Sequence, residues 1–207
     1  ALQGEFMTGV HVLCSPEFFR ALTTHKEVKT AYTNWQQGAV LINDVRSLRR
    51  EGALEATRDT GLAVCLMHMQ GEPGTMQQAP FYKDVVAEVG AYLLARAADC
   101  ERAGIGPDRI VIDPGFGFGK TLEHNLALFR DLRALVARGF PVLVGVSRKA
   151  MIGQVTGRPV HRRLAGGLAL ATLAANAGAS IVRTHDVAAS CDALKMVAAI
   201  NEGVATR

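Results

Sequence analysis

Three observations in the sequence predict an α/β fold with a parallel β-sheet. From Gly38 onward, short apolar runs alternate with longer amphipathic segments, the pattern of repeated β–α units. The runs consist almost entirely of Val, Ile and Leu, as expected for parallel strands covered on both faces. Nearly every run ends in polar or glycine-rich residues, and parallel α/β folds carry their functional sites at that edge. A (β/α)8 barrel and an open doubly wound sheet both fit.

Five strands are predicted after Gly38. They are Val40–Val45, Ala63–Met69, Ile110–Asp113, Val142–Val146 and Ile181–His185. The pattern is weaker over 9–37, where either Val10–Cys14 or Phe18–Leu22 is a further candidate strand. A complete eight-unit barrel usually needs more residues than this chain has, so we expect a barrel to be incomplete at its N-terminal end.

Four helices are predicted from apolar residues at helical spacing, and we expect these stripes to face the core. The stripes are Val85, Val89, Tyr92, Leu93 and Ala97; Leu128, Phe129, Leu132, Leu135 and Val136; Leu164, Leu168, Thr172 and Ala175; and Leu194, Val197 and Ile200. Gly104, Gly139 and Gly178 stand where the first three helices should stop.

The composition is that of an ordinary globular protein. The 207 residues are 49% hydrophobic and 20% charged, so we expect one domain over 1–207 with a sizeable core. Residues 1–6 read as a cloning remnant before Met7, and 7–37 as an atypical segment. No apolar run approaches about 18 residues and no secretory signal is visible, so no membrane partner is predicted.

Charge and cysteine usage narrow the partners. The net charge of +4 comes from scattered Lys and Arg, and aromatic residues make up only 6%, so no nucleic-acid partner is predicted. A mild positive charge suits a small anionic substrate. The four cysteines are far apart, and His68 has no second ligand at metal-binding spacing. We expect reduced thiols in a cytoplasmic protein, and no metal centre from these residues.

The polar strand endings form the candidate site. They are Asn43-Asp44, His68 to Gly71, Asp113 to Lys120, Ser147 to Lys149 and Arg183 to Asp186. Asp113 ends a buried strand, where its carboxylate can accept two hydrogen bonds from a flat amidine-like edge. The glycines after it let a ligand approach the backbone closely. The alternative for Asp113 is a cap in a tight turn, and turn chemistry is likewise the alternative for Asn43 and Asp44.

Cationic groups follow on the next two strands. Lys149, just after Ser147, can hold a phosphate or polarise a carbonyl, although a solvated loop charge explains it equally well. Arg183 and His185 occupy alternate positions and project the same way, which suits an anion such as a diphosphate. The alternative for Arg183 is an ion pair with Asp186. This rim predicts an enzyme acting on a polar heterocycle that carries phosphate.

The same stretches resemble, in order, the signatures of the dihydropteroate synthase family. The resemblance covers most of the chain and is carried by Ile42 to Leu48, Cys65 to Gly71, Asp113 to Lys120, Ser147 to Lys149 and Arg183 to Asp186. It implies a (β/α)8 barrel that condenses 6-hydroxymethyl-7,8-dihydropterin diphosphate with 4-aminobenzoate to give 7,8-dihydropteroate in folate synthesis. It also implies competition by sulfonamides, Mg²⁺ as cofactor and a homodimer.

The resemblance assigns a role to each matching residue. The pterin would be held by Asn43, Met67, Asp113, Gly117 and Lys149, the diphosphate by Arg183 and His185, and 4-aminobenzoate by Phe118, Ser147 and Lys149. Asp113, Lys149, Arg183 and His185 would act on the reacting groups. The family loses diphosphate first, and the arylamine then attacks a cationic pterin methylene that the Asp113 carboxylate would stabilise.

The N-terminal part departs from the family. Members begin with a strand whose Asn helps bind Mg²⁺ and diphosphate, followed by two mobile loops, and neither is found here. Thr23 to Lys26 echoes a family stretch that has a pterin-binding Asp in place of Thr23. Two alternatives to the synthase therefore stay open. One is a pterin-binding or dimer-forming remnant without catalysis. The other is a methyltetrahydrofolate-binding barrel of the corrinoid methyltransferase type, which needs neither Arg183 nor His185.

The Gly- and Ala-rich segment Gly166 to Ala177 is small enough for close contact with a helix of a second subunit. Ordinary packing on the barrel explains it equally well.

Overall fold

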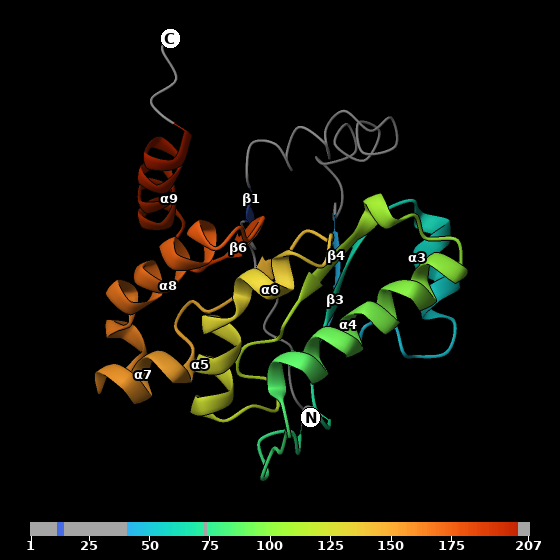
Figure 1. Cartoon of the computed structure of the whole chain (residues 1–207), viewed down its shortest axis with the longest axis horizontal. Coiled ribbons are helices and arrows are strands. Elements are labelled where there is room, and N and C mark those ends of the chain that lie inside the picture. Colours follow the sequence, from blue (N-terminus) through green and yellow to red (C-terminus); the bar gives the residue numbers. More distant parts are fainter. Residues whose placement is uncertain (1–11, 15–40, 73, 203–207) are drawn as a thin grey trace.

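The computed structural model describes residues 12–14, 41–72 and 74–202 (Figure 1). Its parallel strands are β2 (Leu41–Asp44), β3 (Ala63–Met67), β4 (Ile110–Asp113), β5 (Leu143–Val144) and β6 (Ile181–Arg183). The five predicted parallel strands are therefore confirmed, with shorter bounds. The polar residues at the ends of the predicted runs lie beyond the hydrogen-bonded ladder.

The parallel strands lie side by side in chain order. β2 pairs with β3, β3 with β4, and β5 with β6. A parallel bridge between Ile112 and Val142 joins β4 to β5, where the Ile112 amide donates to the Pro141 carbonyl at 2.9 Å. The order β2 to β6 has no reversal, whereas a doubly wound sheet reverses its strand order at a switch point.

The expectation of a wholly parallel sheet is wrong at β1 (Val12–Cys14), which pairs antiparallel with β6. Val12 lies opposite Arg183, and Cys14 opposite Ile181. β1 falls inside the candidate strand 10–14, while the other candidate, 18–22, lies outside the described residues. Two parallel strands that follow each other in the chain need a long crossover connection between them. β1 and β6 are not consecutive in the chain, so no such connection fixes the direction of β1.

Helices cover the outer side of the strands, and Figure 1 shows α4 (Val85–Arg102) lying across β3 and β4. The first apolar stripe is confirmed, since Val85, Val89, Leu93 and Ala97 are buried. The second is divided between α5 (Leu122–Arg130) and α6 (Leu132–Val136), which meet at Asp131. None of the described helices is long and apolar enough to cross a membrane.

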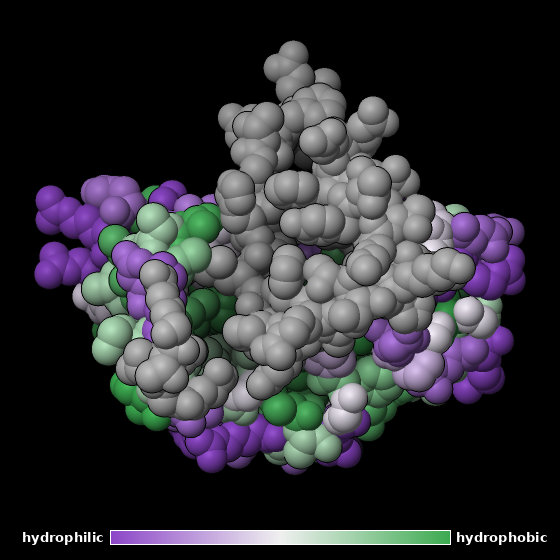
Figure 2. All heavy atoms as spheres, turned by 90° about the horizontal axis from the view of Figure 1, so that it is seen from above, coloured by the Kyte–Doolittle hydropathy of each residue, from purple (hydrophilic) through white to green (hydrophobic). Residues whose placement is uncertain are grey.

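The third and fourth stripes are confirmed only in part as core faces, since Leu168, Thr172, Leu194 and Val197 are half-buried. In α8 (Leu164–Asn176) the buried residues are Ala171 and Ala174, while Leu164 is 43% exposed. In α9 (Val187–Glu202) Ile200 is 77% exposed. Since α8 is apolar all round, periodicity cannot single out its buried face. Figure 2 shows hydrophobic areas on the side of the molecule where α8 and α9 lie.

Two short helices escape the sequence pattern: α3 (Ala53–Thr60) and α7 (Ala150–Thr156). Each is too short to show a repeated apolar stripe. Two 3-10 turns, Pro107–Arg109 and Val160–Arg162, precede β4 and α8. The predicted glycine stops are confirmed, since Gly104, Gly139 and Gly178 all have positive φ just after α4, α6 and α8.

The strands have two buried faces. The outer face packs against the helices through residues such as Val64, Leu66 and Ile112. The inner face carries a second cluster with one residue from each parallel strand: Leu41, Cys65, Val111, Leu143 and Ile181. Because side chains alternate along a strand, the residue two positions further on lies on the same face, one level nearer the strand ends. That level holds the candidate site.

Candidate functional site

Two positions beyond each residue of the inner cluster, on the same face of its own strand, stand Asn43, Met67, Asp113, Gly145 and Arg183. Met67 lies directly opposite Asp113 in the β3–β4 register, while Asn43 lies opposite Cys65. The three residues predicted from these strands to hold a pterin therefore share one face. Asn43 is exposed at the end of β2, and Met67 and Asp113 are buried.

Asp113 is a buried carboxylate among cations. Its side chain is 2% exposed, and its Oδ1 accepts a hydrogen bond from the Gly115 amide at 2.7 Å. Burial raises the pKa of Asp113, and the charges of Lys149 and Arg183 oppose that rise. The hydrogen bond from Gly115 confirms one part of the alternative role for Asp113, the part in which its side chain stabilises a tight turn. No helix is capped by Asp113, because the next helix, α5, has Thr121 as its N-cap. Among the described residues, no donor is bonded to Oδ2.

The loop after β4 requires glycine at two positions. A Cβ on Gly115 would lie 1.9 Å from the His68 carbonyl oxygen, and one on Gly119 would lie 2.4 Å from that of Gln70. Both glycines also have positive φ. The loop therefore lies directly on the backbone that follows β3, and no side chain fits between them.

Lys149 and the glycine-rich loop lie against each other. The Lys149 ammonium stands 4.4 Å from the centre of the Phe118 ring and donates a hydrogen bond to the Phe116 carbonyl. Burial lowers the pKa of Lys149 to about 8, while Asp113 acts to raise it. The solvated-charge alternative for Lys149 is therefore wrong. Gly117 also lies against Lys149, since a Cβ on Gly117 would stand 3.4 Å from the Lys149 side chain. Its amide donates to the Asn125 side chain at 2.7 Å.

The loops after β5 and β6 are joined by two sets of contacts. The Ser147 hydroxyl accepts from the His185 amide at 3.2 Å and lies 3.0 Å from His185 Nδ1. Arg148 forms a two-pronged ion pair with Asp186, at 2.6 and 3.2 Å. The proposed pairing of Arg183 with Asp186 is therefore wrong, since Asp186 pairs with Arg148.

Arg183 occupies the space above Gly145. A Cβ on Gly145 would lie 2.8 Å from a terminal nitrogen of the Arg183 guanidinium. The absent side chain lets the guanidinium lie across β5, where its charge acts on both Asp113 and Lys149. Sequence reasoning missed Gly145, although a glycine inside an apolar strand run is a recognised signal of close approach.

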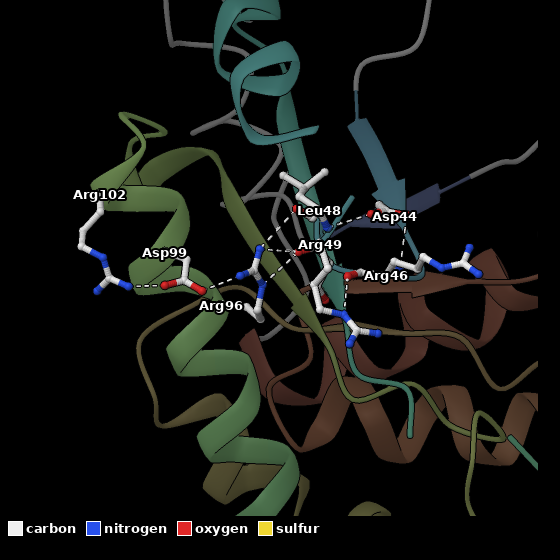
Figure 3. Close-up of polar contacts among 8 residues, drawn as sticks. Asp44, Arg46, Leu48, Arg49, Arg96, Asp99 and Arg102 are labelled. Atoms are coloured by element: carbon white, nitrogen blue, oxygen red, sulfur yellow. Dashed lines mark hydrogen bonds and ion pairs between the residues drawn. The ribbon is translucent and has the colours of Figure 1, made fainter. Parts of the chain in front are cut away.

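The loop after β2 is held in a strained form by contacts from Asp44 and Arg96 (Figure 3). Ser47 and Leu48 both have left-handed backbones, with φ of 53° and 55°. The Asp44 carboxylate accepts from the Leu48 amide at 2.7 Å, so the turn role considered for Asp44 is confirmed. Arg96 donates to the Ser47 carbonyl at 2.8 and 3.0 Å, and the Ser47 hydroxyl donates to the Met67 carbonyl at 2.7 Å. No sequence pattern pointed to Arg96.

A cavity of about 770 Å³ opens on the other side of the glycine-rich loop. Phe118, Gly117 and Lys149 border it, together with the first residues of α5 and α7. Asp113 and Arg183 do not line this cavity. Of the predicted 4-aminobenzoate residues it therefore adjoins Phe118 and Lys149 but not Ser147, and it adjoins neither Arg183 nor His185.

The described residues do not fit a Mg²⁺ held by the protein alone. Across 12–14, 41–72 and 74–202, no three His, Cys, Asp or Glu side chains come together as a metal site. Asp44 is occupied by backbone amides, Asp186 by Arg148, and Asp113 stands among cations. The prediction of Mg²⁺ rests on the family resemblance.

Comparison with known proteins points to one family. Residues 23–185 match the model of the family described as pterin binding enzyme. Dihydropteroate synthase of Escherichia coli (strain K12) is 52% identical over 162 residues, which are 78% of this chain and 57% of that protein.

Solved structures agree. Yersinia pestis dihydropteroate synthase in a sulfonamide drug complex is 45% identical, with a TM-score of 0.79 over 82% of this chain and 62% of that one. Xanthomonas albilineans dihydropteroate synthase with 4-aminobenzoic acid is 46% identical, with a TM-score of 0.75 over 84% and 62%. The chain thus spans somewhat over half the length of these relatives. It belongs to the family of pterin binding enzymes.

Proposed function

We propose that this chain acts as a dihydropteroate synthase, joining 6-hydroxymethyl-7,8-dihydropterin diphosphate to 4-aminobenzoate. The observation that carries the proposal is the group formed by Asp113, Lys149 and Arg183, whose charges act on one another at the ends of β4, β5 and β6. One buried carboxylate beside two cations suits a substrate that has a hydrogen-bond-donating ring edge at one end and an anion at the other.

The charges of this group match those of the reaction. Arg183 and His185 bind the diphosphate and stabilise it as the carbon–oxygen bond breaks. Asp113 accepts hydrogen bonds from the pterin edge, and its negative charge favours the cationic methylene left behind. Lys149 donates to the pterin carbonyl. The arylamine nitrogen then forms the new carbon–nitrogen bond and releases its proton to water.

The remaining predicted residues fit the second substrate. Phe118 borders the cavity beside the glycine-rich loop, and Ser147 lies at the start of the neighbouring loop. An aromatic acid entering there would meet the Phe118 ring and the Lys149 ammonium, while the Ser147 hydroxyl lies outside the cavity lining. Since related structures hold 4-aminobenzoic acid and a sulfonamide drug, we propose that both classes of compound bind here.

For the whole fold we propose a (β/α)8 barrel over the single domain 1–207. The unreversed order β2 to β6 and the inner cluster, with one residue from each strand, support it.

We also propose a homodimer, which the exposed Leu173 of α8 and Met196 of α9 support. The glycines of α8 favour packing within the chain, because a side chain on Gly166 would collide with Ile152 of α7. Cys65, Cys100 and Cys191, the cysteines whose side chains the structure describes, are free thiols, which supports a proposed cytoplasmic location.

One alternative keeps specific support. It is the remnant that binds pterin without turnover, and the match to the pterin binding enzyme family over residues 23–185 supports its binding half. The methyltransferase alternative has no use for the arrangement of Arg183 over Gly145 and of His185 against Ser147.

The deciding experiment measures diphosphate release from the pterin substrate in Mg²⁺ buffer, with and without 4-aminobenzoate. Release that depends on the arylamine supports the synthase. Pterin binding without release supports the remnant, and no binding contradicts both.

Two substitutions test the site itself. Lys149→Ala and Arg183→Ala should each weaken binding of the pterin diphosphate by about tenfold or more, the loss expected for a charge-assisted hydrogen bond. Lys195→Ala and Arg130→Ala remove the same charges from the exposed sides of α9 and α5 and serve as matched controls. Unchanged affinity in both site variants would remove the assignment.

A further inference from the structure

A lysine that the proposed reaction does not use lies buried behind the glycine-rich loop. The side chain of Lys120 is 4% exposed, although lysine is almost never fully buried without partners. Its ammonium nitrogen lies 2.9 Å from His68 Nδ1, 3.0 Å from the Gly115 carbonyl oxygen and 3.0 Å from that of Phe118. These three acceptors match the three N–H groups of an ammonium.

The acceptors of Lys120 come from two loops. Gly115 and Phe118 belong to the loop after β4, and His68 to the segment after β3. Gly115 also donates its amide to Asp113, so Lys120 is one residue removed from the carboxylate. Phe118 carries the ring on which Lys149 rests. Lys120 thus contacts the backbone that positions Asp113 and Phe118, two residues predicted to contact substrate.

We propose that Lys120 is a positioning residue, whose buried side chain ties the loop after β4 to the backbone after β3. It thereby holds Asp113 and Phe118 in the geometry that substrate binding needs. The inference rests on the proposed function for what those two residues bind. It adds a role for a buried cation that lines the cavity beside the loop but directs its hydrogen bonds to protein acceptors.

The charge of Lys120 should matter as well as its hydrogen bonds. Burial lowers the pKa of Lys120 to about 7, although the carboxylate of Asp113 raises it, and Lys149 lowers it further. His68 stays neutral, since burial and Lys120 lower its pKa to about 3, so its Nδ1 can accept. Arg49 is the other cation acting on His68. When Lys120 loses its proton, its bonds lose their charge assistance and Asp113 loses a nearby cation.

The test measures binding of 6-hydroxymethylpterin by its fluorescence between pH 6 and 7.5. This probe carries no diphosphate, so Arg183 and His185 do not contribute. The pH range ends below the pKa of Lys149, about 8, so only a minor fraction of Lys149 loses its proton within it. In the unaltered chain, affinity should fall about two- to tenfold as the pH rises, the change expected for one net hydrogen bond. Lys120→Met should bind more weakly at pH 6 and show no such slope. The exposed Lys195→Met should behave as the unaltered chain does.

A second readout needs no ligand. The backbone amide resonances of Gly115 and Phe118 should titrate with a midpoint near Lys120's own, about 7, and should not do so in Lys120→Met. If Lys120→Met does not fold, this titration in the unaltered chain decides the question.

The two readouts separate the two ideas. If the loop resonances titrate in a chain that binds no pterin, the proposed function is contradicted and the positioning role of Lys120 is supported. Resonances that do not titrate, or equal affinity and slope in Lys120→Met, would overturn the role of Lys120.

Discussion

At the scale of single residues, the site depends as much on missing side chains as on charged ones. Gly145 leaves the space that Arg183 occupies, and Gly115 lets the loop after β4 touch the His68 carbonyl. Alanine at either position would push a neighbour away: a flexible guanidinium in the first case and rigid backbone in the second. The backbone contact tolerates no adjustment, so Gly115 is the more restrictive position.

His68 gives a prediction for stability against pH. Its pKa is lowered to about 3, mainly by burial and then by the charge of Lys120, while an unfolded chain binds that proton near 6.5. Between these values the unfolded state holds more protons, so stability should fall as the pH drops from 6.5 towards 3. The full loss is of the order of 4 kcal/mol.

Urea unfolding between pH 7 and 4 measures this loss. His68→Asn keeps a polar group near Nδ1 and removes the titration, so its stability should depend less on pH over this range. His161→Asn, at an exposed position, is the control and should keep the slope of the unaltered chain. An unchanged slope in His68→Asn would mean that another group causes the acid sensitivity.

At the scale of elements, the loops that carry the site are fixed by contacts to neighbouring elements. The loop after β2 is held by Arg96 of α4, the loop after β4 by Lys120 and Asn125, and the loop after β5 by Asp186 beyond β6. In the described part of the chain, left-handed non-glycine residues stand in the loops after β2 (Ser47 and Leu48), β3 (Ala79) and β5 (Arg148). Strained residues persist only where their surroundings hold them, so these contacts set the shape of the rim.

Arg96→Met tests this support. The change removes the donors to the Ser47 carbonyl and leaves a strained, buried loop without its partner. We expect a loss of about 2–3 kcal/mol in the free energy of unfolding, measured in urea. Arg130→Met, on the exposed side of α5, should change stability by less than about 0.5 kcal/mol. Equal losses in the two variants would show that Arg96 holds nothing.

At the scale of the whole molecule, the strands separate two apolar layers. The outer layer lies under the helices, and the inner one is a single level of side chains beneath the site. The inner cluster is apolar, and Asp113 is the charged residue that directly follows it on β4. Burial is the main cause that raises the pKa of Asp113 and lowers that of Lys149.

Leu66→Ala tests the outer layer. Leu66 is fully buried between β3 and the helices, so the cavity left behind should lower the free energy of unfolding by about 2–5 kcal/mol. Leu126→Ala on α5, where the side chain is 37% exposed, should lose far less. A small loss at Leu66, measured by urea or thermal unfolding, would indicate that the helices repack over β3.

The sequence by itself determined the parallel strands, the first apolar stripe and the rim residues. A buried parallel strand must be a continuous apolar run, and a polar ending must face the open edge, so both leave a local trace. It could not determine the buried face of α8, whose residues are apolar on every side. Nor could it show Arg96, the pairing of Arg148 with Asp186, or the tether of Lys120. Those contacts join residues from about 38 to 52 positions apart. Only the packing of the elements decides which distant partners meet. The local sequence around a single charged residue is the same whether its side chain is solvated or buried.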